Sequence, residues 1–204
     1  ALGLGACSGS DANHVRFAAI SARIPADTPF ALIHVEREGE PTPADASSDE
    51  WLTLFRARVL ELLGVDLFDP TSRAAIGLDA KAEWALFGVG LHPAFAIAAQ
   101  DPVKLEAELA RLEGEQRLRS SALGALKLRK LELGEVELSF VLHEGFLLGV
   151  YHDRDEPLEP LFAALVAAAP RPDLEREAAF AAAVKSLDPG TATMLYVDVA
   201  RLDA

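Results

Sequence analysis

Five histidines are the residues of this chain whose side chains could bind a metal ion or transfer protons near neutral pH. They are His14, His34, His92, His143 and His152. The alternating pattern on either side of Glu144-Gly145 predicts a hairpin with His143 and His152 at opposite ends, about 20 Å apart at roughly 3.3 Å per residue. No His-Glu-x-x-His and no paired-cysteine spacing occurs in the chain. The sequence therefore predicts no metal site and no cofactor.

An acidic cluster follows the predicted hairpin and comprises Asp153, Asp155, Glu156 and Glu159. Its Asp-x-Asp spacing can begin a calcium loop, but the glycine and the closing bidentate glutamate of such a loop are missing. We therefore expect a solvated turn whose acidic side chains favour the N-terminus of the following helix.

Pairs of side chains that could catalyse a reaction are few. No Gly-x-Ser-x-Gly nucleophile elbow occurs, and Gly88-Val89-Gly90 lacks the third glycine and the following helix of a nucleotide site. Glu137 and His152 face each other across the predicted hairpin, which favours a surface ion pair over an acid/base unit. The sequence predicts that the chain is not an enzyme, and an enzyme built from scattered residues is kept as a third alternative.

The only cysteine, Cys7, lies in a segment that resembles the lipobox of bacterial lipoproteins. Leu4-Gly5-Ala6-Cys7 places two small residues between a leucine and the cysteine, and the polar tether 8–13 follows. The resemblance implies that Cys7 carries diacylglycerol and an N-acyl group such as palmitate, which together give a stable anchor. In the sorting rule of such lipoproteins an Asp directly after the cysteine favours the inner membrane, so the resemblance, with Ser8 at that position, implies the outer membrane. Residues 1–6 are shorter than a signal peptide's apolar stretch of about 7–15 residues, so the chain begins inside a clipped signal peptide, or the match is chance and Cys7 is an unreactive thiol.

Composition excludes several classes of protein. The 19 basic and 32 acidic residues give a net charge of -13, which disfavours both nucleic acid and adsorption to anionic lipid. Half of the residues are hydrophobic, enough for a substantial core. No later run reaches about 18 consecutive apolar residues, so no spanning helix is expected. Any membrane attachment must then come from the lipid on Cys7.

Periodicity predicts an α+β domain, with a mainly antiparallel sheet of about six or seven strands and helices packed mostly on one face. Strands are expected over 30–35, 82–90, 94–99, 123–133, 136–143, 146–152 and 192–199, and helices over 47–64, 69–77, 101–112, 153–169 and 173–187. Residues 14–24 fit either a short helix or an extended lead-in. A slip in the alternation at Arg129-Lys130 suggests a bulge.

The hairpin of 136–152 has a predicted register in which residue numbers adding to 289 face each other. Phe140 then lies opposite Gly149, where an aromatic ring can cover the strand glycine. Tyr151 shares this face. Phe140, Gly149 and Tyr151 are the candidate lining of a cavity for an apolar ligand.

A turn-then-strand layout occurs twice, each time after a helical or semi-helical lead. Pro25-Ala26-Asp27-Thr28 precedes the first strand, and Pro189-Gly190-Thr191 precedes the last. We therefore expect a tether with lipobox remnant over 1–13, an α+β domain over 14–190, and the truncated start of a second similar module over 191–204.

Four short segments carry a further resemblance. They are Ile24-Pro25-Ala26-Asp27-Thr28-Pro29, the stretch 64–79, Asp101-Pro102 before a helix, and Leu195-Tyr196-Val197-Asp198-Val199. Together they resemble a family of uncharacterised, exported bacterial proteins, many of them lipid-anchored, known only as a domain of unknown function. The resemblance spans 24–204 and implies an α+β envelope module, often in two similar halves, with no assigned catalytic residues.

The resulting functional hypothesis is a lipid-anchored, non-enzymatic module of the bacterial cell envelope, at the outer membrane. It would bind or support another envelope component. The alternative is a carrier or sensor of an apolar ligand, such as a lipid, in the periplasm.

Overall fold

The computed structural model describes residues 17–35, 57, 60–61, 64–66, 69–79, 83–166, 173–188 and 193–202 of the 204-residue chain. Cys7 and most of the predicted helix 47–64 lie outside these residues.

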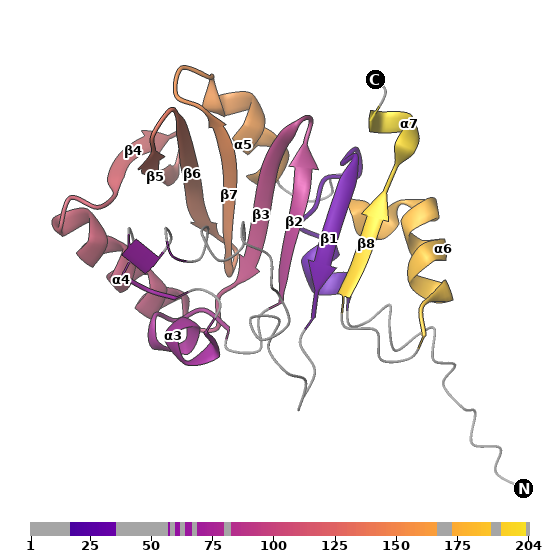
Figure 1. The fold of residues 1–204 in the computed structure, drawn as a ribbon, viewed down its shortest axis with the longest axis horizontal. Coiled ribbons are helices and arrows are strands. Elements are labelled where there is room, and N and C mark those ends of the chain that lie inside the picture. The colour runs from indigo at the N-terminus through magenta and orange to yellow at the C-terminus, as the bar shows by residue number, and fades with distance from the viewer. Residues whose placement is uncertain are drawn as a thin grey trace, which may run out of the picture.

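One eight-stranded sheet, antiparallel at every described pairing, crosses the molecule (Figure 1). Its strands are β1 (Phe30–His34), β2 (Trp84–Val89), β3 (His92–Ala98), β4 (Arg119–Leu123), β5 (Leu126–Leu133), β6 (Val136–His143), β7 (Phe146–Asp153) and β8 (Thr193–Val197). Their order is β4-β5-β6-β7-β3-β2-β1-β8, so the last strand lies beside the first. The predicted α+β class with a mainly antiparallel sheet is confirmed.

Two of the helices begin at the predicted Asp-Pro signals. The helical elements are α3 (Pro70–Ala75), α4 (Pro102–Gly114), α5 (Leu158–Val166), the 3-10 turn η2 (Leu174–Arg176), α6 (Ala178–Ser186) and α7 (Val199–Leu202), with a helical turn over 17–21. The Asp69 carboxylate accepts the Ser72 N–H at 2.7 Å, and that of Asp101 accepts the Lys104 N–H at 3.0 Å. Asp173 caps only the 3-10 turn, because the chain is extended again at Glu177 before α6 begins.

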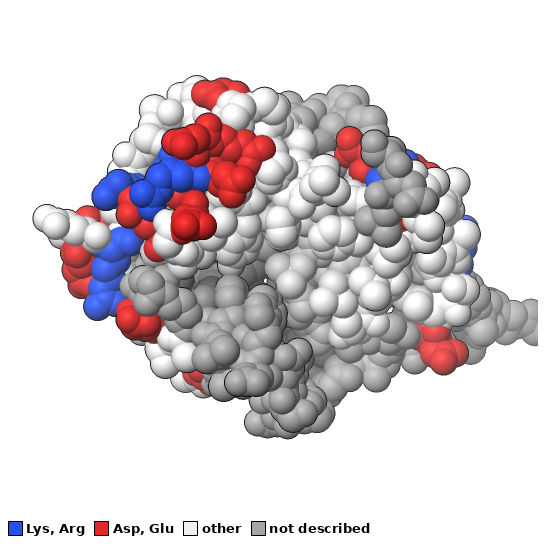
Figure 2. Space-filling model, turned by 45° about the horizontal axis from the view of Figure 1, so that its top comes forward, with Lys and Arg blue, Asp and Glu red and all other residues white. Residues whose placement is uncertain are grey.

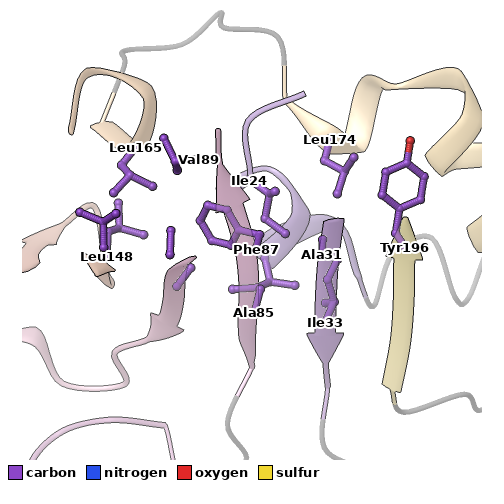
Figure 3. Packing of buried hydrophobic residues seen from close by; sticks show 14 of the residues in the cluster. Ile24, Ala31, Ile33, Ala85, Phe87, Val89, Leu148, Leu165, Leu174 and Tyr196 are labelled. Carbon is purple, nitrogen blue, oxygen red and sulfur yellow. The ribbon is translucent and has the colours of Figure 1, made fainter. Parts of the chain in front are cut away.

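The main core lies between one face of the sheet and a layer formed by α5, α6 and the turn 17–21. Figure 3 shows side chains of the sheet, such as Phe87 and Tyr196, on the same side as Ile24 and Leu174. The largest buried members of this core include Phe17, Ile20, Phe87, Leu148, Phe162 and Phe180. Each such side chain contributes about 1.5–3 kcal/mol when fully buried.

A second core lies on the opposite face, under α4. Leu105, Leu109 and Leu112 recur at helical spacing and are buried against sheet residues such as Phe95 and Phe140. The expectation of helices mostly on one face thus describes α5, α6 and the turn 17–21, whereas α4 covers the other face over the β4–β7 end. Both faces of β5, β6 and β7 are therefore buried.

The bulge predicted at Arg129-Lys130 is wrong. Arg129 pairs with Phe140 and Lys130 with Ser139 in an uninterrupted register. The alternation slips because Arg129 occupies an inward position under α4, where its side chain is only 1% exposed. An arginine that is neutralised by carboxylates can fill a position where the pattern calls for an apolar residue.

Candidate functional site

The candidate lining residues are packed in the second core. Phe140 lies opposite Gly149, as predicted, and the whole register of β6 and β7 follows numbers adding to 289. The ring of Phe95, from β3, fills the space over Gly149, since a Cβ there would lie 2.3 Å from Phe95 Cε1. Burial raises the pKa of Tyr151 to about 12. Phe140, Gly149 and Tyr151 thus lie close together, but the space beside Gly149 that a ligand would need is occupied by the ring of Phe95.

A buried serine–histidine pair is the arrangement that the sequence analysis missed. Ser139 Oγ lies 2.8 Å from His152 Nε2, and His152 Nδ1 lies 2.7 Å from the carbonyl oxygen of Asp153. The Asp153 carbonyl can only accept, so Nδ1 donates to it; in the neutral imidazole Nε2 is then the acceptor of the Ser139 hydroxyl proton. This resembles an activated nucleophile, but Ser139 and His152 are 0% and 3% exposed. A substrate cannot reach either atom, and the pair serves to satisfy two polar groups in the core.

The predicted surface ion pair between Glu137 and His152 is wrong. The two residues are cross-strand neighbours, but both are buried. Both ring nitrogens of His152 are already hydrogen-bonded, so the Glu137 carboxylate pairs instead with Lys130 at 3.3 Å and Arg154 at 3.9 Å.

Among the described residues, no three His, Cys, Asp or Glu side chains converge in a way that could hold a metal ion. None of the described helices is both long and apolar enough to cross a membrane.

Charged side chains gather at the β4 end of the sheet. Figure 2 shows Lys, Arg, Asp and Glu intermingled on this side, whereas the surface on the β1–β8 side is mostly uncharged. Arg129 joins β5 to α4 through Glu113, at 2.5 Å, and through Glu106. Burial alone would raise the pKa of Glu113, but hydrogen bonds from Lys127 and Arg129 outweigh it and hold the pKa below its ordinary value. This network is internally neutralised and leaves little charge to attract a ligand.

At the other end, a row of leucines crosses three strands. Leu86 of β2 lies opposite Leu32 of β1, which lies opposite Leu195 of β8. Alternation places this leucine row on the face away from the main core. Leu86 is 43% exposed and Leu195 is 66% exposed. A folded chain rarely leaves neighbouring large apolar side chains in water without a partner for them.

The leucine row ends at β8, which is an edge strand of the described sheet. No described strand lies beyond β8, and its sequence, Thr-Met-Leu-Tyr-Val, contains no charge and no proline. The Asp198 N–H donates to the Pro29 carbonyl at 2.8 Å. Because hydrogen-bonded pairs alternate in antiparallel strands, the backbone groups of Leu195 and Val197 point away from β1. We call this side of β8 the outer edge.

No family model, curated protein or solved structure matches the chain. The resemblance to the exported family therefore stays a prediction. What the described geometry can do is bind protein: the outer edge offers backbone donors and acceptors to another strand, and the leucine row offers apolar contact beside it.

Proposed function

We propose that the chain is a lipid-anchored, non-enzymatic module of the bacterial cell envelope, whose sheet is extended at the outer edge of β8 by a strand of another protein element. The observation that carries this proposal is the uncharged edge strand beside the exposed Leu86 and Leu195. Free edges of this kind are normally blunted by charge, proline or a covering segment, because they otherwise pair with other strands.

The membrane part of the proposal is supported by sequence. Leu4-Gly5-Ala6-Cys7 resembles a lipobox, and the net charge of -13 disfavours direct adsorption to anionic lipid. Attachment at the outer membrane through acyl chains on Cys7 is consistent with both features.

The packing of the second core gives no support to the carrier alternative at its predicted lining. Phe95 occupies the space beside Gly149 that a ligand would need. The assembly function is therefore the one that we propose.

Metabolic labelling tests the anchor. Cells expressing the chain behind a complete lipoprotein signal are grown with labelled palmitate and fractionated. We expect label in the protein and recovery with the outer membrane, and we expect Cys7→Ala to lose the label and to leave the membrane fraction. An unlabelled protein, or identical fractionation of the Cys7→Ala variant, would refute the anchor.

Photo-crosslinking tests the assembly. A photoreactive residue at Val197, on β8, is compared with one at Ser121, on β4. Both positions are exposed. We expect one discrete adduct from Val197 and none from Ser121, with the crosslinked peptide identified by mass spectrometry. Equal, diffuse labelling at both positions would contradict a specific role for β8.

A further inference from the structure

Two segments that are 163 positions apart share sequence features and the order of their described helical element and strand. Phe17-Ala18-Ala19 is repeated as Phe180-Ala181-Ala182, and the same spacing relates Thr28 to Thr191 and Leu32 to Leu195. In each segment a helical element precedes a strand: the turn 17–21 precedes β1, and α6 precedes β8. We call them unit A (17–35) and unit B (180–198).

The two units bury equivalent side chains in one core. Phe17 and Phe180 are 1% and 2% exposed and belong to the same hydrophobic cluster. In the strands, Ala31 and Ile33 are buried in unit A, and their counterparts Met194 and Tyr196 are buried in unit B. The two units therefore match in sequence and also in which face of the strand is buried in the main core.

The pairing of β1 with β8 is symmetric about the leucines. Leu32 lies opposite its own counterpart, Leu195. Ala31 lies opposite Tyr196, the counterpart of Ile33, and Ile33 lies opposite Met194, the counterpart of Ala31. This is the register of a local two-fold axis that passes between Leu32 and Leu195 and exchanges β1 and β8.

The repeated threonine has a known contact in unit A. Thr28 Oγ accepts the N–H of Gly88 at 3.1 Å, and it lies 2.8 Å from each of the carbonyl oxygens of Gly88 and Phe30, which are the acceptors for its one proton. Thr28 is 1% exposed, so the hydroxyl joins the entry of β1 to β2. Its counterpart, Thr191, lies outside the described residues. The sequence of unit B nevertheless keeps a threonine at the position whose hydroxyl, in unit A, contacts β2.

We infer that β8 is the first strand of a second copy of this module, and that its outer edge receives the β2-type strand of that copy. The inference rests on the proposed extension of the sheet at β8 and names the strand that extends it. The local two-fold carries β2, which borders β1, onto the outer side of β8. Leu195 then takes the place that Leu32 has beside Leu86, and the leucine row continues across the axis.

The small size of the edge favours a strand of the same polypeptide over one from a separate molecule. An edge of five residues is far smaller than a standard protein interface of about 1,600 Å², and a separate partner would lose translational and rotational freedom on binding. A strand that follows β8 in the same polypeptide avoids most of that cost. The occupant is therefore a segment of the second module and not a second β8 from another molecule.

A peptide with the β2 sequence, residues 83–90 with terminal lysines for solubility, tests the inference on the 204-residue chain. Amide hydrogen exchange is followed by NMR. We expect saturable binding that slows exchange of the Leu195 and Val197 amides, which point outward, and leaves those of β4 unchanged.

Leu86 lies opposite Leu32, whose backbone groups point toward β2, so the Leu86 N–H points toward β1. N-methylation of the peptide at Leu86 should weaken binding by about tenfold, whereas N-methylation at Phe87 should not.

Leu195→Pro is the matched protein variant, because proline removes only an outward N–H and is tolerated on sheet edges. We expect it to lose peptide binding while Leu195→Thr retains it. The N-methylated peptides test the same contact without altering the protein. Unchanged exchange at Leu195 and Val197, or equal binding of both N-methylated peptides, would overturn the inference. The inference would also be overturned if sedimentation without peptide showed a dimer that Leu195→Pro abolishes.

Palmitate labelling and crosslinking at Val197 do not depend on which strand binds. If the peptide experiments fail, those two measurements still test the proposed function separately.

Discussion

The sheet ends in two edge strands of opposite character. β4 carries Arg119, Ser120 and Ser121, all exposed, and beside it runs the ionic network that joins β5 to α4. β8 carries no charge and is held from behind by α6, where the rings of Phe180 and Tyr196 meet edge to face at 5.6 Å. One edge is adapted to water, and the other has the composition of an interior strand. Under the proposed function, β8 and not β4 is therefore the edge of the described sheet that we expect to take part in assembly.

The largest expected effect is at the β8 end. Phe180→Ala removes a fully buried ring that packs on Tyr196, and we expect it to lower the free energy of unfolding by about 4 kcal/mol. Urea denaturation followed by circular dichroism measures this. Ala181→Gly, on the same helix, is the control and should cost only about 1 kcal/mol. Equal losses would mean that α6 does not hold β8 through its aromatic contact.

At the β4 end, Arg129→Ala should cost about 3 kcal/mol, because it leaves the partly buried Glu113 carboxylate without its guanidinium partner. Arg119, which pairs with Glu132 at 2.5 Å on the surface, is the matched control. Arg119→Ala should cost less than about 1 kcal/mol. If the two variants unfold at the same urea concentration, the network does not stabilise this end of the sheet.

The same network predicts a dependence on pH. The folded-state pKa of Glu113 is lowered from its ordinary value of 4.5, so its contribution is fully present above that value and is lost as the pH falls through the lowered pKa. We expect the free energy of unfolding to fall between about pH 5 and pH 3, and to fall less steeply in Arg129→Ala. Parallel curves for the two proteins would exclude Glu113 as the source.

The smallest effect on stability is expected for Leu195→Lys. Leu195 is 66% exposed, so the free energy of unfolding should change by less than about 0.5 kcal/mol. Binding of the β2 peptide should nevertheless weaken, since lysine protects an edge strand. Titration of the peptide followed by NMR measures this, with Ser121→Lys on β4 as the control that should have no effect. A similar weakening in both variants would mean that net charge, and not the β8 edge, governs peptide binding.

The sequence predicted the features that depend on near neighbours. The register of β6 and β7 follows from alternation on both sides of a two-residue turn, and Asp69 and Asp101 cap their helices because the carboxylate reaches an N–H only three residues away. It failed at Arg129, since the carboxylates that allow an arginine to be buried lie on α4, outside any local pattern. The strand over Arg119–Leu123 was missed as well, because its exposed polar residues lack an apolar alternation.

The candidate site shows the same limit. Phe140 opposite Gly149 was predictable, but the ring that fills the glycine's space belongs to Phe95 in a different hairpin. Likewise, the repeat around Thr28 and Thr191 was visible in the sequence, but not that its two strands are neighbours.

The sequence by itself determined the α+β class, the hairpin register and the helix starts, because side-chain period, turn length and capping act within a few residues. Only the tertiary structure decided that Leu32 pairs with Leu195, that α4 covers the second face, and that β8 ends the described sheet. The reason is physical. Backbone hydrogen bonds between strands are the same for every sequence, so which distant strands become neighbours depends on how all the apolar faces are buried together.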